Sequence, residues 1–323
     1  MLQKFVYIMI AACTAATGYA AEAWVPDRAV EIVAGSGAGG AQDRTARTMQ
    51  KIWKESNIIS LPVNVVNKPG GGGAISMAYL NQQGSNGHYI AVGSPSLLIN
   101  HISGKGKIGL DDVTPLALLF SEYIAIAVRN ESPIKTGADL IQRMKSDPGS
   151  VSVAVATARG GMQHIAVGRI AKTIGVDVGK VRVVVFNSGS ESITQVLGGH
   201  IDVVATAVAN AAPHVTNGQL RIIGIAAPQR LPGALANVPT WKEQGVDVVV
   251  SNWRSVMGPK GMTAAQVAWW DGAFQKLVKT AEWNEDIQKN YWVNNYLGSA
   301  DSQKFFAAQY EELRGALNDL LVK

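Results

Sequence analysis

The sequence contains very little cysteine and little charge. Cys13 is the single cysteine among 323 residues, so neither an internal disulfide nor a cysteine-based zinc cluster can form. Charged residues make up 16% of the chain and hydrophobic residues 47%, a balance that is typical of globular proteins rather than disordered chains. The net charge is only +5, and the basic residues are scattered without a long run. This pattern argues against a nucleic-acid-binding protein.

The sequence also lacks the common signatures of catalysis. Its five histidines do not show the close spacing of zinc ligands, and no G-x-S-x-G motif is present to mark a hydrolase nucleophile. His164 follows a glycine pair and is interpreted as a capping or packing residue. We therefore predict no catalytic residue and no metal site.

One motif could indicate a nucleotide cofactor, but its context argues against that. Gly35, Gly37 and Gly40 fit the G-x-G-x-x-G pattern of dinucleotide-binding proteins. The acidic residue that should end the second strand is missing, because that strand ends at Val66-Asn67-Lys68. The glycine run Gly70–Gly73 has no following Gly-Lys-Ser/Thr, so it is not a phosphate-binding loop of the Walker type. We therefore predict no cofactor.

The N-terminus resembles a secretory signal peptide. Residues 1–20 contain Lys4, a short apolar stretch and the small residues that precede a cleavage site. The apolar stretch is too short to span a membrane. An alternative is lipid anchoring at Cys13, which follows Ile10-Ala11-Ala12 as in a bacterial lipoprotein. We expect an exported, soluble, periplasmic protein.

The rest of the chain alternates short apolar runs with segments of helical periodicity. Alternation of this kind predicts an α/β protein with mainly parallel sheets covered by helices. The pattern predicts a helix from Thr263 to about Ala281 and a last helix over 301–321. The predicted strands are Val30–Ala34, Val63–Asn67, Tyr89–Ser94, Tyr123–Arg129, Val151–Thr157, Val181–Phe186, Val203–Ala207, Leu220–Ala226 and Val246–Met257.

Two of these strands run into a glycine-rich turn and then a helix. The turns are Gly35–Gly40 and Ala158–Met162, and their similar layout suggests two related lobes. The first amides of a helix have no internal partner and attract anions. A single turn provides too few hydrogen bonds for micromolar binding, whereas two turns that face each other provide enough. The alternative is that both are ordinary tight turns without a ligand.

Several short motifs, in order, resemble the periplasmic solute-binding proteins of tripartite tricarboxylate transporters, also called the Bug family. The resemblance extends from Trp24 to the C-terminus. Its motifs are Pro26-Asp27-Arg28, Gly39-Gly40-Ala41-Gln42-Asp43, Asn67–Gly73, Asn86-Gly87-His88-Tyr89, Leu197–Asp202, Asn237-Val238-Pro239-Thr240 and Gly258-Pro259-Lys260-Gly261.

This resemblance implies a two-lobed, type II periplasmic-binding fold that closes on a small carboxylic acid and delivers it to a two-component membrane permease. It implies that lobe one comprises 24–122 and 250–323 and lobe two 123–249, with crossings near Phe120–Tyr123 and Ser251–Ser255. It also implies a monomer that is not an enzyme. The ligand-binding candidates are Gly39, Gly40, Ala41, Gln42, Asp43, Ser94, Ser96, Thr157, Arg159, Gly160, Gly161, Met162, Gln163, Ser188, Ser190, Thr206 and Asn210.

The chain departs from the family pattern at two of these positions. Gln42 stands where a small hydroxyl residue is common, and Arg159 where the residue is usually small or polar. Arg159 could pair with a second carboxylate and favour a dicarboxylate or aromatic diacid, or it could be an exposed loop residue. Arg254 is a second possible cation. An exported hydrolase and a ligand sensor for a membrane receptor are the alternative functions.

Overall fold

The computed structural model describes residues 24–156 and 158–321. The predicted signal peptide and Cys13 lie outside these residues. The strands are β1 Val30–Ala34, β2 Val63–Asn67, β3 Tyr89–Gly93, β4 Val113–Arg129, β5 Ser152–Ala156, β6 Arg182–Phe186, β7 Val203–Ala207, β8 Leu220–Ile225 and β9 Ser251–Pro259. The α-helices are α1 Ala41–Glu55, α2 Ala74–Asn81, α3 Ser96–Ile102, α4 Gly137–Ser146, α5 Met162–Thr173, α6 Gly189–Leu197, α7 Val208–Thr216, α8 Ala264–Leu277, α9 Ala281–Lys289 and α10 Ser299–Leu321.

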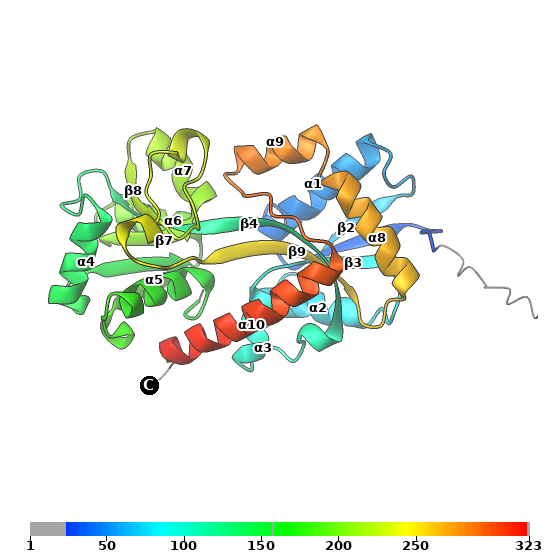
Figure 1. Cartoon of the computed structure of the whole chain (residues 1–323), viewed down its shortest axis with the longest axis horizontal. Coiled ribbons are helices and arrows are strands. Elements are labelled where there is room, and N and C mark those ends of the chain that lie inside the picture. Colours follow the sequence, from blue (N-terminus) through cyan, green and yellow to red (C-terminus); the bar gives the residue numbers. More distant parts are fainter. Residues whose placement is uncertain (1–23, 157, 322–323) are drawn as a thin grey trace, which may run out of the picture.

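The protein has two α/β lobes, which confirms the predicted fold class (Figure 1). Lobe one contains the parallel strands β2, β1 and β3, and lobe two the parallel strands β7, β5 and β6. Strand β4 belongs to both lobes, so the strand order runs without a break as β2-β1-β3-β9-β4-β7-β5-β6. Strand β8 pairs with the second half of β4.

The long strand β4 and its partner β9 form the crossing between the lobes. In lobe one, β4 pairs with β9 from Val113 to Tyr123, and from Ile124 onward it pairs with β7 and β8. The predicted strand over 123–129 was therefore too short, because β4 begins at Val113. The predicted strand over 246–257 began too early, because β9 starts at Ser251.

The helices at the C-terminus also differ from the prediction in one place. Thr263 caps α8 through a capping box with Gln266, as the sequence predicts. The helix ends at Leu277 instead of Ala281, because Thr280 accepts a hydrogen bond from the amide of Trp283 and starts a separate helix, α9.

Helix α10 connects the two lobes. Its Phe306 packs on Trp253 of the crossing, with ring centroids 4.8 Å apart, and its Tyr310 hydrogen-bonds His101 of α3 in lobe one. Farther along, Glu312 pairs with Arg169 of α5 in lobe two. Figure 1 shows this helix running from one lobe to the other beside the crossing strands. A continuous apolar cluster beneath it joins the cores of both lobes.

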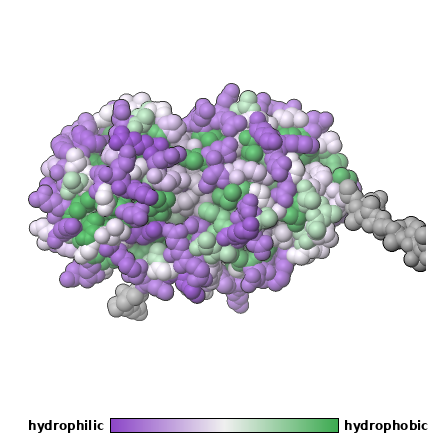
Figure 2. Space-filling view, in the orientation of Figure 1, coloured by the Kyte–Doolittle hydropathy of each residue, from purple (hydrophilic) through white to green (hydrophobic). Residues whose placement is uncertain are grey.

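Lobe one has a further aromatic core on its other side. Trp53, Trp270 and Phe274 pack together, and Trp270 and Trp283 are fully buried, whereas Trp269 is half-buried. The outer surface is different: on the face shown in Figure 2, hydrophilic and hydrophobic residues are intermingled. In the described part of the chain, no helix combines the length and the apolar character needed to cross a membrane.

Candidate functional site

The strand directions bring the carboxyl ends of both sheets toward the crossing. Strands β1 and β3 run parallel to β4, because β9 is antiparallel to both β3 and β4. Their carboxyl ends therefore point from lobe one toward lobe two. Strands β7, β5 and β6 run antiparallel to β4, so their carboxyl ends point toward lobe one. The loops after these strands form the candidate site, since ligands bind at the carboxyl ends of strands in open α/β sheets.

In lobe one, the loop after β1 leads directly into α1. Gly39 has a φ of 77°, a conformation that favours glycine, and Gly40 is an N-cap without a side-chain cap. Among the described residues, the amides of Ala41 and Gln42 have no hydrogen-bond partner. These two donors at a helix N-terminus are available to an anion.

The side chain of Asp43 stabilises this loop through hydrogen bonds. Its buried carboxylate accepts hydrogen bonds from the amide of Gly39 at 2.8 Å, from Asn67 Nδ2 at 2.8 Å and from Arg47 Nε at 3.0 Å. Burial raises the pKa of Asp43, but these hydrogen bonds outweigh it and hold the pKa below its usual range. The partners occupy the carboxylate, so it stabilises the loop rather than facing the cleft.

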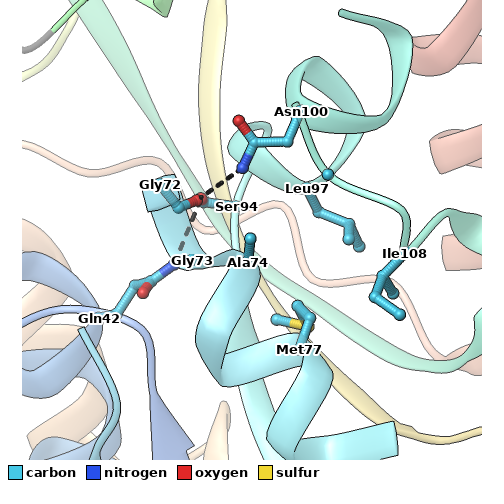
Figure 3. Close-up of a pocket in the computed structure, with 10 residues that line it drawn as sticks. Gln42, Gly72, Gly73, Ala74, Met77, Ser94, Leu97, Asn100 and Ile108 are labelled. Atoms are coloured by element: carbon cyan, nitrogen blue, oxygen red, sulfur yellow. Dashed lines mark hydrogen bonds between the residues drawn. The ribbon is translucent and has the colours of Figure 1, made fainter. Parts of the chain in front are cut away.

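The loop after β3 lies beside the first loop. Ser94 is almost fully buried, and its Oγ accepts a hydrogen bond from Gln42 Nε2 at 3.3 Å. Ser96 is the first residue of α3 and is half-buried. The structure thus brings together Gln42 and Ser94 from the predicted set (Figure 3).

In lobe two, the loop after β5 repeats the arrangement at α1. Thr157 lies outside the described residues. Gly160 has a φ of 83°, and Gly161 is an N-cap without a side-chain cap. The amides of Met162 and Gln163, which begin α5, have no hydrogen-bond partner among the described residues.

Two side chains define the surroundings of this second loop. His164 Nδ1 accepts a hydrogen bond from the Gly160 amide at 2.9 Å, which agrees with its predicted capping role. Burial, together with the charge of Arg159, lowers the pKa of His164 to about 4. Arg159 is exposed and donates to the carbonyl of Val183 at 3.1 Å.

The remaining candidates in lobe two gather at the ends of β6 and β7. Ser188 caps α6 by accepting from the amide of Glu191, and Ser190 lies in the first turn. Asn210 of α7 donates to Thr206 Oγ1 at 3.3 Å. A side chain at Gly189 would meet Asn210 Nδ2 at 2.8 Å, so glycine permits the close approach of α6 and α7.

The sequence did not indicate two residues that line the pocket next to Gln42. Gly73 and Asn100 lie there with Ser94, and Asn100 Nδ2 donates to the carbonyls of Gly71 and Gly72 (Figure 3). For Gly73 the sequence did contain a local feature, the glycine run Gly70–Gly73, but it was interpreted only as a turn; in the structure all four glycines have positive φ. Asn100 has no local signal, because it lies on a short helix without a motif.

Comparison with known proteins identifies the family. The model of the tripartite tricarboxylate transporter family receptor matches residues 46–319. The chain belongs to this family. A Cupriavidus necator protein described as the UPF0065 protein in the gbd 5' region is 28% identical over 322 residues, which cover 96% of this chain and 95% of the relative. The match to this relative is therefore nearly full-length.

Solved structures have the same fold. A TctC solute-binding protein from Polaromonas is 25% identical, with a TM-score of 0.78 over 91% of this chain and 99% of that one. A Rhodopseudomonas palustris protein with bound malate is 20% identical (TM-score 0.74, covering 90% and 99%), and an R. palustris protein with adipate is 19% identical (TM-score 0.78, covering 91% and 98%). The two-lobed receptor fold is thus shared along nearly the whole length of these chains.

Proposed function

We propose that the protein is a periplasmic receptor that captures a small carboxylic acid between its lobes and delivers it to a two-component membrane permease. The observation that supports this proposal is the pair of helix N-termini at Gly40 and Gly161. Each lies at the carboxyl end of a strand directed toward the other lobe, and each leaves at least two amides without a partner among the described residues.

The number of donors agrees with the binding of a carboxylate. A hydrogen bond to a charged group contributes about 1.5–3 kcal/mol. Micromolar binding requires about 8 kcal/mol in addition to the cost of association. Two amides from one lobe are too few, whereas amides from both lobes provide enough. The ligand therefore stabilises the closed arrangement of the lobes.

The ligand class is supported by the family and by the structural neighbours. The family is one of transporter receptors rather than enzymes, and the two R. palustris structures contain malate and adipate, both dicarboxylates. We extend this ligand class to the present chain. The permease partner follows from the family's transport role, and the periplasmic location follows from the predicted signal peptide at 1–20. We propose that the receptor is a monomer, as the family resemblance implies.

A thermal-shift screen of mono-, di-, tricarboxylic and aromatic acids tests the ligand class. A ligand at a hundred times its dissociation constant adds about 2.7 kcal/mol to the free energy of unfolding, which raises the melting temperature by several degrees. Recovery of the unchanged acid after long incubation would distinguish a receptor from a hydrolase. If no acid raises the melting temperature, the proposal is wrong.

A proline substitution tests the position of the carboxylate. Ala41→Pro removes one of the free amides, and proline is tolerated at the first position of a helix. Gly40 already has the extended backbone that a residue before proline requires (φ −69°, ψ 165°). We expect at least tenfold weaker acid binding with an unchanged melting temperature of the unliganded protein.

The matched control is Ala264→Pro at the first position of α8. Its preceding residue, Thr263, has a similar backbone (φ −71°, ψ 157°), but α8 does not follow a strand that points toward the crossing. This variant should bind acid like the wild type. Equal binding by wild type and Ala41→Pro would contradict the assigned position.

Uptake of the labelled acid into vesicles that contain the permease, with and without the receptor, tests delivery.

A further inference from the structure

The side chain of Gln42 fills the place where the carboxyl ends of β1 and β3 meet. Its Nε2 donates to Ser94 Oγ at 3.3 Å, at the end of β3. Its Oε1 lies so close to Gly35, at the end of β1, that a Cβ there would be 2.6 Å away. From β1 the chain passes through α1 to β2 on one side, and β3 lies on the other side. Ligands bind at such a switch point, and here a carboxamide occupies it.

A narrow pocket begins at this carboxamide. Gln42 and Ser94 lie at one end with Gly73, while Met77, Leu97 and Ile108 form an apolar wall farther in (Figure 3). Leu97 and Met77 are almost completely buried. Asn100 fixes the adjoining glycine loop through its hydrogen bonds to Gly71 and Gly72. We use the name apolar slot for the space lined by Met77, Leu97 and Ile108.

We propose that Gln42 determines the length of acid that the receptor accepts, by closing the apolar slot to the ligand. This inference rests on the proposed function, because it concerns the same site. The carboxamide of Gln42 has the shape of a carboxylate and occupies the position that the end of a longer ligand would need. A short acid held by the amides of Ala41 and Gln42 fits in front of it.

A smaller residue at this position would connect the slot to the cleft. The carbon chain of a longer acid could then lie against Met77, Leu97 and Ile108. Each methylene group that leaves water for an apolar surface strengthens binding by about fourfold. The wild type should therefore favour short acids, and a variant with a small residue should favour long ones.

The test compares dicarboxylic acids from succinate to suberate on wild type, Gln42→Ser and Gln42→Asn, with dissociation constants from calorimetry. We expect wild-type affinity to fall with chain length, whereas Gln42→Ser affinity should rise by about fourfold for the first added methylene group and then level off, because the slot is narrow. Gln42→Asn keeps the carboxamide on a shorter side chain. The chain-length preference of this variant should therefore lie between those of the wild type and Gln42→Ser. Gln50→Ser is the matched control: it lies on the same helix, and its side chain bonds Val63 away from the cleft. Gln50→Ser should bind the dicarboxylic acids in the same order of affinity as the wild type.

The outcomes separate the two proposals. If the wild type binds acids but Gln42→Ser keeps the wild-type preference for length, or loses all acids equally, the inference about Gln42 is wrong. If the wild type binds no acid of any class, the proposed function fails and this inference fails with it. Melting curves of the unliganded variants show that each is folded.

Discussion

The carboxylate of Glu122 and the guanidinium of Arg254 lie 3.7 Å apart on the two strands that join the lobes. Both side chains are more than nine-tenths buried, and Asn252 also donates to Glu122 at 3.2 Å. Burial raises the pKa of Glu122, although the nearby charge of Arg254 opposes this effect. A buried ion pair therefore connects β4 to β9 at the point where the lobes meet.

Removal of one partner from this ion pair should strongly destabilise the protein. Arg254→Met or Glu122→Gln leaves a buried charge without its partner, which costs about 3–5 kcal/mol. The double variant should lose less than the sum of the single variants, since neither charge then remains. Chemical denaturation of the three variants measures this coupling.

An exposed ion pair gives the control. Lys304 and Asp301 of α10 are 80% and 65% exposed at their side chains, and Asp301→Asn should cost less than about 1 kcal/mol. Additive losses in the Glu122 and Arg254 variants would show that the two side chains do not interact energetically.

Asp43 should affect binding without contacting the ligand. Asp43→Ala removes the acceptor for Gly39, Asn67 and Arg47, which should destabilise the protein by about 1–3 kcal/mol and loosen the loop that presents the amides of α1. Acid affinity should therefore fall together with the melting temperature. A ligand with an added amine or hydroxyl group should lose no more affinity than a plain acid. A selective loss for that ligand would show direct contact instead.

The sequence predicted local features of the fold well, and its errors have physical causes. Strands β1, β2 and β7 have the predicted bounds, because short β-branched runs bounded by turn residues have few other conformations. The first half of β4, from Val113 to Glu122, was missed. It contains three leucines and Pro115, so its apolar pattern did not distinguish a strand from a helix.

The site could be predicted only where its signals are local. A glycine between a strand and a helix marks the turns at Gly40 and Gly161, and both are N-caps in the structure. The contact of Gln42 with Ser94 is not local, because it depends on the order of the strands in the sheet. Candidate positions were therefore readable from the sequence, whereas the way in which Gln42 fills the switch point was not.

The pH dependence of stability should contain a contribution from His164. The pKa of His164 in the folded protein is about 4, below the ordinary histidine value of about 6.5. As the pH falls, the unfolded chain therefore takes up this proton first. Stability from this group is complete above about pH 6.5 and is lost as the pH falls toward 4. A shift of this size corresponds to roughly 3 kcal/mol.

His164→Asn separates this effect from other titrating groups. The Asn side-chain oxygen can accept the Gly160 amide in place of Nδ1, but it does not titrate. Calorimetric melting at pH 4.5 and 7.5 should show a smaller loss of stability for the variant than for the wild type. Equal losses would show that His164 does not contribute.

Arg159 should distinguish diacids from monoacids. Arg159 belongs to the loop after β5, and its exposed guanidinium donates to the carbonyl of Val183 in β6, which uses one of its five donors. The remaining donors match a second carboxylate. Arg159→Ala should weaken diacid binding by about tenfold or more and leave monoacid binding nearly unchanged, as measured by calorimetry. Arg143→Ala, which removes an exposed arginine from α4, is the control for net charge. Equal losses for both acid classes would mean that Arg159 acts only through the loop, because a residue that recognises the second carboxylate cannot affect a ligand that lacks one.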